Sequence, residues 1–333
     1  MKYSIILPVR NGGEYVKECV SSILSQTLND FNLHVLDNCS TDGTLEWISS
    51  LNDERIRISP SDKPLSIEEN FKRAISTSKN QFMTLIGHDD ILLNNYLQVM
   101  DELIAEHPAA SLYQTHFSYI DGMGKRIREC KPMNDVETAG DFLTSLLTNS
   151  IDIRGTGFMM RSEDYDALGG IPSYPNLLFA DYELWLNLTK KSYKATATQN
   201  CFSYRLHQST TSISPDVKLH QAFEQFIYFL KSLQNQDENL RNVIRKHGEQ
   251  FLMVNCKGLS HRLLRTPIDK RDNLSVKTFL AKCKHYAQLL MTGDNFKPTS
   301  DISIWLAGVL DSSAVGRRLF LGFKRVYSRP VLK

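Results

Sequence analysis

Two adjacent carboxylates follow an apolar run near residue 90, and they are the first candidates for chemistry. Residues 82–86 read Phe-Met-Thr-Leu-Ile, and Gly87 and His88 then lead into Asp89 and Asp90. The run predicts a buried strand that delivers the two acids to its carboxyl end, the edge at which open α/β sheets bind ligands. Neighbouring carboxylates repel each other unless a cation lies between them, so Mg²⁺ or Mn²⁺ bridging a diphosphate is the natural ligand. A strand-ending turn, where Asp is also common, is the alternative.

Two earlier strand ends carry polar residues as well. Residues 4–9 and 33–36 each predict a short strand that runs into a polar loop. The carboxyl ends of parallel strands meet along one edge of a sheet, so we expect segments 8–11, 37–42 and 88–90 to lie together. Together they would outline a nucleotide pocket.

The first half of the chain alternates short apolar runs with helical patterns, which is typical of βα units and a mostly parallel sheet. Ser66 to Glu69 has the form of a capping box that begins a helix. Further strands are expected at 55–59, 111–120 and 155–160, and helices at 14–27, 44–51, 94–106 and 182–190. The sequence therefore predicts an α/β domain.

Strand patterns disappear past residue 216, and long helical patterns such as 221–233 and 274–291 take their place. We therefore expect two domains, an α/β domain over residues 1–215 and a helical region over 216–333. A chain of 333 residues is long enough for both.

The composition bounds the function classes. Hydrophobic residues make up 41% and charged residues 23%, which is ordinary for a globular enzyme, and a net charge of +2 gives no reason to expect a nucleic acid partner. The cysteines show no CxxC pair or zinc-finger spacing, which excludes those motifs and favours a reducing cytosol; they stand at 19, 39, 130, 201, 256 and 283. The apolar run at the N-terminus is too short for a signal peptide, and no stretch approaches the roughly 18 apolar residues of a membrane-spanning helix.

A series of motifs occurs in the order typical of one family. They lie at residues 4–12, 22–27, 37–44, 69–74, 89–90, 169–170, 181–186 and 204–207. The sequence resembles the family 2 glycosyltransferases over roughly residues 3 to 210. That resemblance implies a GT-A fold and a transfer of sugar from a nucleoside diphosphate donor, typically with inversion at the sugar carbon.

The resemblance also implies which residues hold the donor. Pro8, Arg10 and Asn11 match the loop that passes under the base and ribose. Asp37 and Asn38 match the acidic pair that contacts the base and the ribose hydroxyls, where acceptor oxygens suit a uracil N–H or a sugar O–H. Asn38 replaces the more usual second Asp, so the identity of the base stays open.

Asp89 matches the metal-binding acid of the family's DxD motif, whose first acid is replaced here by Gly87. One carboxylate, diphosphate oxygens and waters can still hold Mg²⁺ or Mn²⁺. Asp90 is expected to contact the donor sugar or to lie behind the metal.

Three further residues are assigned to the donor site by the same resemblance. Asn70 lies in a matching motif. Arg205 is a candidate cation for the diphosphate, and His207 is a candidate ligand of the metal or the diphosphate. An exposed arginine and a packed or surface histidine are the alternatives for the last two.

Asp181 matches the acid proposed as catalytic base, although the Glu that commonly precedes it is Ala180 here. An inverting transfer needs a group that takes the proton from the attacking hydroxyl, and a carboxylate can do so. The alternative is a first-turn acid that stabilises the start of a helix. The segments 155–157 and 169–170 match the acceptor side of the family, though plain turns would look the same.

The C-terminal segment combines basic and apolar residues. No acidic residue follows Asp311. The basic residues are Arg317, Arg318, Lys324, Arg325, Arg329 and Lys333. Such a segment suits contact with an anionic membrane or a partner, and a packed helix with a solvated basic face is the alternative. Membrane contact would suit a cytoplasmic enzyme, peripheral on the inner face of the membrane, that uses a saccharide or lipid-linked acceptor in bacterial surface polysaccharide assembly.

Two other functions remain open at this point. A nucleotidyltransferase also uses a carboxylate-held metal, but residues 10–13 contain only one basic residue where a basic glycine-rich loop would be usual. A non-catalytic sugar-nucleotide binder or scaffold is suggested by Gly87, Asn38 and Ala180. The presence of both Asp89 and Asp181 argues against it.

Overall fold

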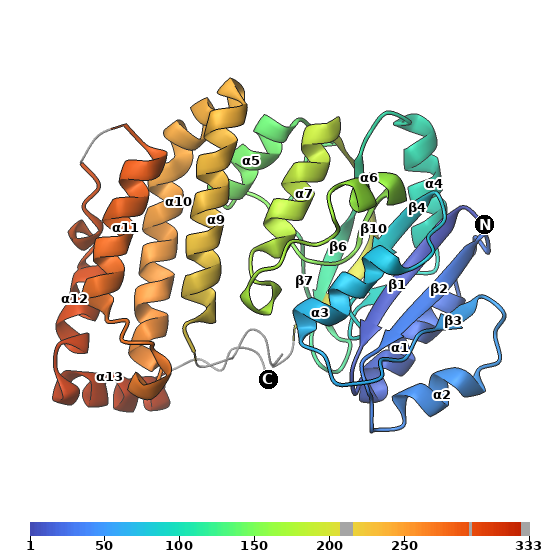
Figure 1. Ribbon diagram of the computed structural model, residues 1–333, viewed down its shortest axis with the longest axis horizontal. Coiled ribbons are helices and arrows are strands. Elements are labelled where there is room, and N and C mark those ends of the chain that lie inside the picture. The colour runs from blue at the N-terminus through green and yellow to red at the C-terminus, as the bar shows by residue number, and fades with distance from the viewer. Residues whose placement is uncertain (207–215, 293–294, 328–333) are drawn as a thin grey trace. The chain divides into compact units, whose positions relative to one another are not determined.

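A ten-stranded mixed sheet organises the first part of the chain (Figure 1). The computed structural model describes residues 1–206, 216–292 and 295–327. They divide into two compact units. Unit 1 comprises residues 1–142, 151–173 and 180–206, and unit 2 comprises residues 143–150, 174–179 and the described residues from 216 onward.

The sheet has the strand order β3-β2-β1-β4-β9-β6-β10-β5, with β7 paired to β6 and β8 to β10. Its strands are β1 (Tyr3–Val9), β2 (Phe31–Asp37), β3 (Ile56–Ile58), β4 (Phe82–Leu85), β5 (Ile91–Leu92), β6 (Leu112–Ile120), β7 (Arg126–Glu129), β8 (Val136–Glu137), β9 (Phe158–Arg161) and β10 (Lys194–Arg205). β1 runs parallel to both β2 and β4, so the ends of these three strands lie at one edge, as the sequence predicts.

Helices connect the strands of unit 1. They are α1 (Gly13–Leu24), α2 (Thr44–Ser50), α3 (Ile67–Lys72), η1 (Arg73–Ser76), α4 (Tyr96–Glu106), α6 (Ser162–Ala167) and α7 (Ala180–Lys191). α5 (Ala139–Leu147) begins in unit 1 and continues into unit 2. α4 packs on β6 and β10, and α7 packs on β6. The expectation of an α/β sheet flanked by helices is confirmed.

The sequence patterns explain the central strands. All seven residues of β1 are buried, as expected for a parallel strand covered on both faces. The predicted capping box is present at α3, where Ser66 accepts from the Glu69 N–H and the Glu69 carboxylate accepts from the Ser66 N–H. The expected strand at 155–160 begins only at Phe158. Gly157 before it has φ +81°, and a Cβ there would lie 2.7 Å from the Phe202 ring.

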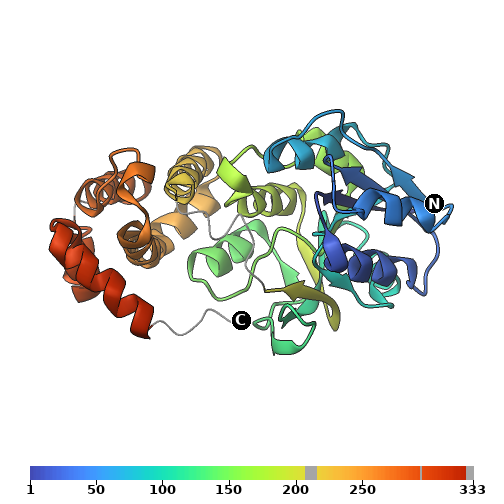
Figure 2. The ribbon, with the colours of Figure 1, turned by 90° about the horizontal axis from the view of Figure 1, so that it is seen from below.

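Unit 2 is helical, as expected. Its elements are η2 (Pro175–Leu177), α9 (Lys218–Gln236), α10 (Glu238–Arg265), η3 (Ile268–Lys270), α11 (Val276–Leu290), η4 (Pro298–Ser300), α12 (Ile302–Asp311) and α13 (Ala314–Tyr327). α9, α10 and α11 pack side by side and are seen end-on in Figure 2. Phe223 and Phe226 of α9 and Phe251 of α10 form an aromatic cluster in which Phe251 is 5.9 Å from each of the other rings.

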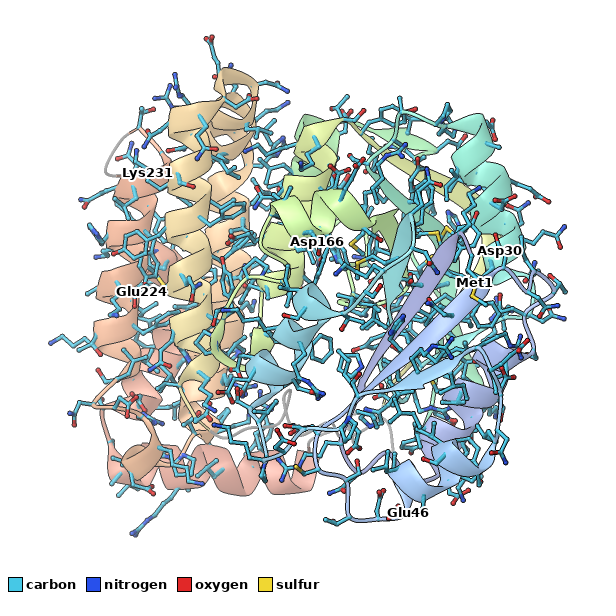
Figure 3. The ribbon with its side chains drawn as sticks, turned by 45° about the vertical axis from the view of Figure 1, so that its right-hand side comes forward. Met1, Asp30, Glu46, Asp166, Glu224 and Lys231 are labelled. Carbon is cyan, nitrogen blue, oxygen red and sulfur yellow. The ribbon has the colours of Figure 1, made fainter. Side chains whose placement is uncertain are left out.

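Figure 3 draws the side chains on the ribbon and labels six residues of the two units. At the start of the sheet, the Met1 ammonium lies 3.7 Å from the Asp30 carboxylate. None of the helices within the described ranges is both long and apolar enough to cross a bilayer.

Candidate active site

The loops after β1 and β2 are joined by hydrogen bonds. The Asn11 N–H donates to Ser40 Oγ (2.9 Å), and the Thr41 N–H donates to Asn11 Oδ1 (2.8 Å). Asn11 has φ +53°, a left-handed conformation that Asn tolerates better than most residues. Pro8 lies buried in β1 opposite Leu36, and Arg10 is exposed. These contacts hold the two strand-end loops side by side.

Asp37, the last residue of β2, is almost completely buried, with 1% of its surface exposed. Its Oδ2 accepts from the Ser40 N–H (3.2 Å), whereas its buried Oδ1 has no hydrogen-bond partner among the described residues. Arg73 donates to the Asp37 carbonyl (2.8 Å) and fixes the end of the strand. A buried carboxylate oxygen without a partner is costly, and a ligand N–H or O–H would satisfy it.

Asn38 and Asn70 are both engaged by backbone. Asn38 Nδ2 donates to the Leu65 carbonyl (2.9 Å), and its Oδ1 accepts from the Leu65 N–H (2.7 Å). Asn70 Nδ2 donates to the Leu36 carbonyl (3.2 Å), and its Oδ1 accepts from Arg73 (2.9 Å). Both amides therefore hold the backbone next to Asp37 in place, Asn38 through Leu65 and Asn70 through Leu36.

Asp89 and Asp90 converge beside Gly87. A Cβ on Gly87 would lie 2.7 Å from Asp89 Oδ1 and 3.0 Å from Asp90 Oδ2, so the glycine makes room for both carboxylates. Asp90 is buried; its Oδ2 accepts from Thr156 Oγ1 (2.6 Å) and its Oδ1 from the Arg205 N–H (3.0 Å). Burial, together with the charge of Asp89, raises the pKa of Asp90 well above its ordinary value.

The Arg205 guanidinium is buried and engaged by protein groups. Its Nε donates to the Asp89 carbonyl (2.8 Å), and its Nη2 donates to the Glu18 carboxylate (2.5 Å). Its Cζ lies 4.7 Å from the centre of the Tyr15 ring. Arg205 therefore holds the Asp89 backbone in place, and this role needs no contact with a diphosphate.

The two carboxylates also fit a divalent cation. The space that a Cβ on Gly87 would fill is lined by one oxygen from each, and such hard oxygen donors suit Mg²⁺ or Mn²⁺. Both Asp90 oxygens accept protein hydrogen bonds, and the family resemblance assigns the metal to Asp89. Within the described ranges, no group of three or more His, Cys, Asp or Glu is placed to hold a metal. The candidate ligand His207 lies outside the described residues.

Asp181 lies in the first turn of α7, facing Gly155. A Cβ on Gly155 would lie 3.8 Å from the Asp181 Cβ, so the glycine permits a close approach. Burial raises the pKa of Asp181 from 3.8 to about 6, while the Tyr182 N–H and the Arg154 charge act in the opposite direction. A carboxylate with a pKa near the working pH is suited to accept a proton.

Arg154 was missed by the sequence analysis. Its Cζ lies 4.8 Å from the centre of the Tyr119 ring and 4.9 Å from that of Tyr204, and it donates to the Tyr119 hydroxyl. The Arg154 carbonyl accepts from Trp185 Nε1 (2.9 Å) on α7. The only sequence signal was a basic residue directly before Gly155-Thr156-Gly157.

The segment 154–157 brings the two halves of the site together. Gly155 lies beside Asp181, and the next residue, Thr156, donates to Asp90. The predicted catalytic base and the strand-end carboxylates thus border the same loop.

A pocket of about 200 Å³ lies elsewhere in unit 1. Lys72, Glu183 and Asn187 line it together with residues 168–173 and Leu184. Gly169 and Gly170 of the segment expected on the acceptor side belong to this lining, whereas Asp37, Asp89 and Asp181 do not.

Comparison with known proteins places these features in context. The family model "Glycosyl transferase family 2" matches residues 4–169. The putative teichuronic acid biosynthesis glycosyltransferase TuaG of Bacillus subtilis is 27% identical over 63% of this chain and 81% of its own length. The UDP-Glc:alpha-D-GlcNAc-diphosphoundecaprenol beta-1,3-glucosyltransferase WfgD of Escherichia coli is 24% identical over 63% of this chain and 79% of its own length.

The extent of the match differs among relatives. In the glycosyltransferase GlyG of Streptococcus pneumoniae the 26% identical alignment spans only 41% of that protein. Among solved structures, residues 1–349 of S. aureus TarS in complex with UDP-GlcNAc match with a TM-score of 0.66 at 14% identity, covering 99% of this chain and 93% of that one. This likeness extends over both units, but at such low identity it concerns the fold.

Proposed function

Because the chain belongs to the family 2 glycosyltransferases and has their GT-A fold, we propose that it transfers a sugar from a nucleoside diphosphate to an acceptor hydroxyl with inversion. The observation that carries this proposal is the position of Asp181. A half-buried carboxylate with a pKa of about 6 borders the same loop as the strand-end acids of a nucleotide-binding sheet.

The donor is assigned to the edge formed by β1, β2 and β4. The unpartnered Asp37 Oδ1 is the acceptor for an N–H of the base or a hydroxyl of the ribose, and residues 8–11 form the adjoining loop. Asn38 and Asn70 shape this end through backbone contacts instead of contacting the nucleotide themselves. Asn38 then does not decide between uracil and other bases.

Asp181 removes the proton from the acceptor hydroxyl as its oxygen attacks the sugar C1 from the face opposite the diphosphate. The new C–O bond forms as the bond to the diphosphate oxygen breaks. The proton ends on the Asp181 carboxylate and passes to water once the product leaves. A divalent cation held by Asp89 would offset the negative charge that develops on the leaving diphosphate. Arg205 and Thr156 keep Asp89 and Asp90 in place for that role.

The acceptor is proposed to be a saccharide or a lipid-linked saccharide in surface polysaccharide assembly, with the enzyme acting in the cytoplasm at the inner face of the membrane. Support comes from relatives named for teichuronic acid biosynthesis and for transfer to a diphosphoundecaprenol-linked sugar. The basic, apolar C-terminal segment is compatible with this location.

The first experiment is a calorimetric and thermal-shift screen of UDP-, dTDP- and GDP-sugars with and without Mn²⁺. We expect one nucleotide class to stabilise the protein, with a larger shift when metal is present. The Asp37→Asn variant removes a charged acceptor without changing its size, and it should weaken that binding. Glu54→Gln, an exposed acid on the loop before β3, is the control.

Three outcomes would contradict parts of the proposal. Binding of a nucleotide sugar without transfer to any acceptor or water would favour a non-catalytic binder. Binding of a nucleoside triphosphate in preference to the diphosphate sugar would favour a nucleotidyltransferase. Transfer that retains the anomeric configuration would remove the assigned role of Asp181 as base.

A further inference from the structure

α12 is apolar on more than one side. From Ile302 to Leu310 it has no charged residue, and it buries Ile304 and Ala307 against its own unit. On its other side Ile302, Trp305, Leu306 and Val309 are between 45% and 79% exposed. These four residues follow helical spacing, so they form one continuous apolar stripe. A helix that is apolar all round is normally covered on all sides.

α13 carries a second stripe directly after the first. Val315, Leu319 and Phe323 recur every four residues and are between 58% and 69% exposed. We call the seven exposed apolar residues of α12 and α13 the apolar face. Exposed apolar stripes on two consecutive helices mark an interaction site more often than a free surface.

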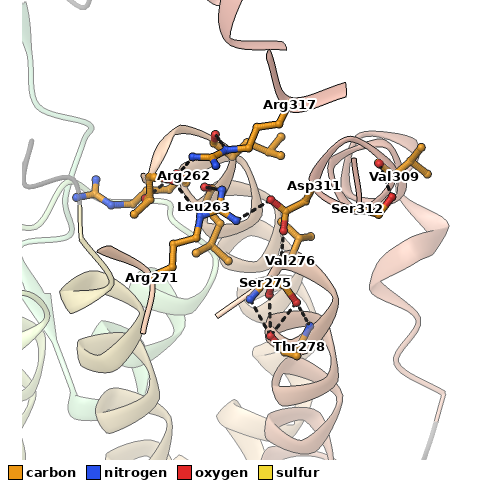
Figure 4. A network of polar contacts seen from close by, with 12 residues as sticks. Arg262, Leu263, Arg271, Ser275, Val276, Thr278, Val309, Asp311, Ser312 and Arg317 are labelled. Carbon is orange, nitrogen blue, oxygen red and sulfur yellow. Dashed lines mark hydrogen bonds and ion pairs between the residues drawn. The ribbon is translucent and has the colours of Figure 1, made fainter. Parts of the chain in front are cut away.

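Polar contacts hold this part of unit 2 in place, as Figure 4 shows. The Asp311 carboxylate at the end of α12 accepts from Arg271 (2.6 Å) and from the Val276 N–H (2.8 Å). Arg317 on α13 donates to the carbonyls of Leu264 (3.2 Å) and Thr266 (2.5 Å). The buried ion pair and the carbonyl contacts hold the two helices in place within unit 2, while the residues of the apolar face are exposed.

The charge beside the apolar face is mainly basic, and the acid at the start of α12, Asp301, is paired with Lys257. Asp311 is paired with Arg271, and residues 312–333 contain six Lys or Arg and no Asp or Glu. Among them, the exposed Arg318 and Lys324 lie on α13 itself. We propose that the apolar face docks on an anionic lipid bilayer, with the Ile302, Trp305, Leu319 and Phe323 side chains entering the interface and the basic residues of α13 contacting lipid phosphates.

A bilayer suits this face better than a second copy of the chain. A symmetric dimer through α13 would place two basic surfaces against each other, and their repulsion costs free energy. An anionic bilayer would instead attract the basic surface. Exposed aromatic and aliphatic side chains next to basic ones are the usual composition of a helix that lies at a membrane surface. Docking through the apolar face would bring the enzyme to the lipid-linked acceptor. This part of the inference rests on the proposed function.

The test uses the full chain and sedimentation of vesicles, with no donor or acceptor present. The vesicles are phosphatidylcholine alone or phosphatidylcholine with about 30 mol% phosphatidylglycerol. We expect binding to the anionic vesicles only, and weakening of it by salt. The double variant Leu319→Ser, Phe323→Ser and the double variant Arg318→Gln, Lys324→Gln should each lower the partition coefficient by about tenfold or more.

The matched control is Tyr228→Ser, Val254→Ser, which removes two apolar side chains of α9 and α10 that are 50% and 53% exposed. It should stay within about twofold of the native protein. Equal loss in the control, or no binding by the native protein, would overturn the proposal. So would a dimer in light scattering that the Leu319→Ser, Phe323→Ser variant dissociates, because a second copy would then be the partner.

Donor binding by calorimetry separates this proposal from the proposed function. The two double variants that weaken vesicle binding should bind the nucleotide sugar with native affinity and should unfold at the same temperature as the native protein. Vesicle binding without donor binding would leave the docking surface in place and reject the transferase. Donor binding without vesicle binding would reject the docking surface and leave the proposed transferase function in place.

Discussion

Asp181 carries a cost to stability that its proposed role explains. Its pKa is raised from 3.8 to about 6, so the folded state binds the proton more tightly than the unfolded chain does. The ionised carboxylate therefore destabilises the fold, and the loss accumulates as pH rises from about 4 to about 6. At about 1.4 kcal/mol for each pKa unit, the full cost at neutral pH is at most about 3 kcal/mol.

We therefore expect Asp181→Asn to lower transfer by roughly 10²–10⁴-fold while raising the free energy of unfolding at pH 7.5 by about 1–3 kcal/mol. Donor affinity should hardly change. Steady-state kinetics, calorimetry and urea unfolding measure the three quantities. Glu183→Gln, in the same turn of α7, is the control. If both variants lose activity equally, the acids only stabilise the start of the helix.

The pH dependence of transfer gives a second prediction at this scale. A catalytic base must be deprotonated, so kcat/KM should fall as pH drops through about 6. The Arg154 charge lowers the pKa of Asp181, and Arg154→Gln should therefore move this acid limb to higher pH. Arg154→Lys keeps the charge and should leave the limb near its native position. A limb that is unchanged in Arg154→Gln would show that the arginine is only a packing residue.

Gly87 gives a third prediction, because a side chain there would crowd the carboxylates of Asp89 and Asp90. Its Cβ would lie 2.7 Å from Asp89 Oδ1 and 3.0 Å from Asp90 Oδ2. Gly87→Asp should destabilise the protein by about 1–3 kcal/mol through crowding, with like-charge repulsion in addition. It should not tighten Mn²⁺ binding. Gly87→Ala separates crowding from charge, and a Gly87→Asp protein that is stable and binds Mn²⁺ more tightly would contradict the argument.

The site could be predicted from the sequence only where a strand end fixes a residue's position. Asp37, Asp89 and Asp90 follow apolar runs, and three parallel neighbours bring them to one edge. The roles of Asn38 and Arg205 depend on contacts with Leu65 and Glu18, which are distant in sequence. Spacing along the chain carries no information about such partners.

At the scale of elements, a continuous apolar run predicts a strand, whereas an interrupted apolar pattern does not. β1 and β4 are continuous apolar runs, whereas the 12-residue β10 carries Thr196, Gln199 and Asn200 in its middle. β10 changes register with β6 twice there, so its apolar pattern is interrupted. α10 lies in the region that was expected to be helical, but its bounds were not predicted, because over 28 residues its apolar residues contact helices on several sides and leave no single stripe.

α10 also permits a test of helix propensity without a change in packing. A Cβ on Gly258 would meet no atom within 4 Å. Gly258→Ala should therefore stabilise the protein by about 0.5–1 kcal/mol, because alanine loses less backbone entropy in a helix. Gly316→Ala on α13 is the matched control, since its Cβ would lie 3.2 Å from the Leu310 carbonyl oxygen and should cancel the gain. Chemical unfolding measures both, and equal effects would contradict this explanation.

At the scale of the whole molecule, the chain order does not coincide with the two units. The sequence predicts a boundary after residue 215, yet segment 174–179 belongs to unit 2. In this segment Asn176, Leu177 and Phe179 all have φ between +54° and +66°, which is strained for residues other than glycine. The Phe179 ring lies 5.8 Å from Phe223 and 5.4 Å from Phe226, and Lys218 donates to Asn176 (3.1 Å).

These contacts matter for catalysis because the chain passes directly from Phe179 into α7 and Asp181. A fragment of residues 1–215 lacks Phe223, Phe226 and Lys218, so it loses these contacts to the strained segment 174–179. Residues 8–11, 37–42 and 88–90 lie entirely in unit 1. We therefore expect the fragment to bind the nucleotide sugar within about threefold of native affinity but to transfer at least about tenfold more slowly, since misplacing a catalytic group by about 1 Å is costly.

In the full chain, Phe226→Ala should show the same split in milder form, with a lower kcat and a nearly native donor affinity. Leu290→Ala, a buried residue of α11, controls for general loss of stability in unit 2. If Leu290→Ala lowers kcat as much as Phe226→Ala does, the effect is one of stability alone. A fragment 1–215 with native kcat would show that Asp181 is positioned without unit 2, and the helical unit would then serve the acceptor or the membrane only.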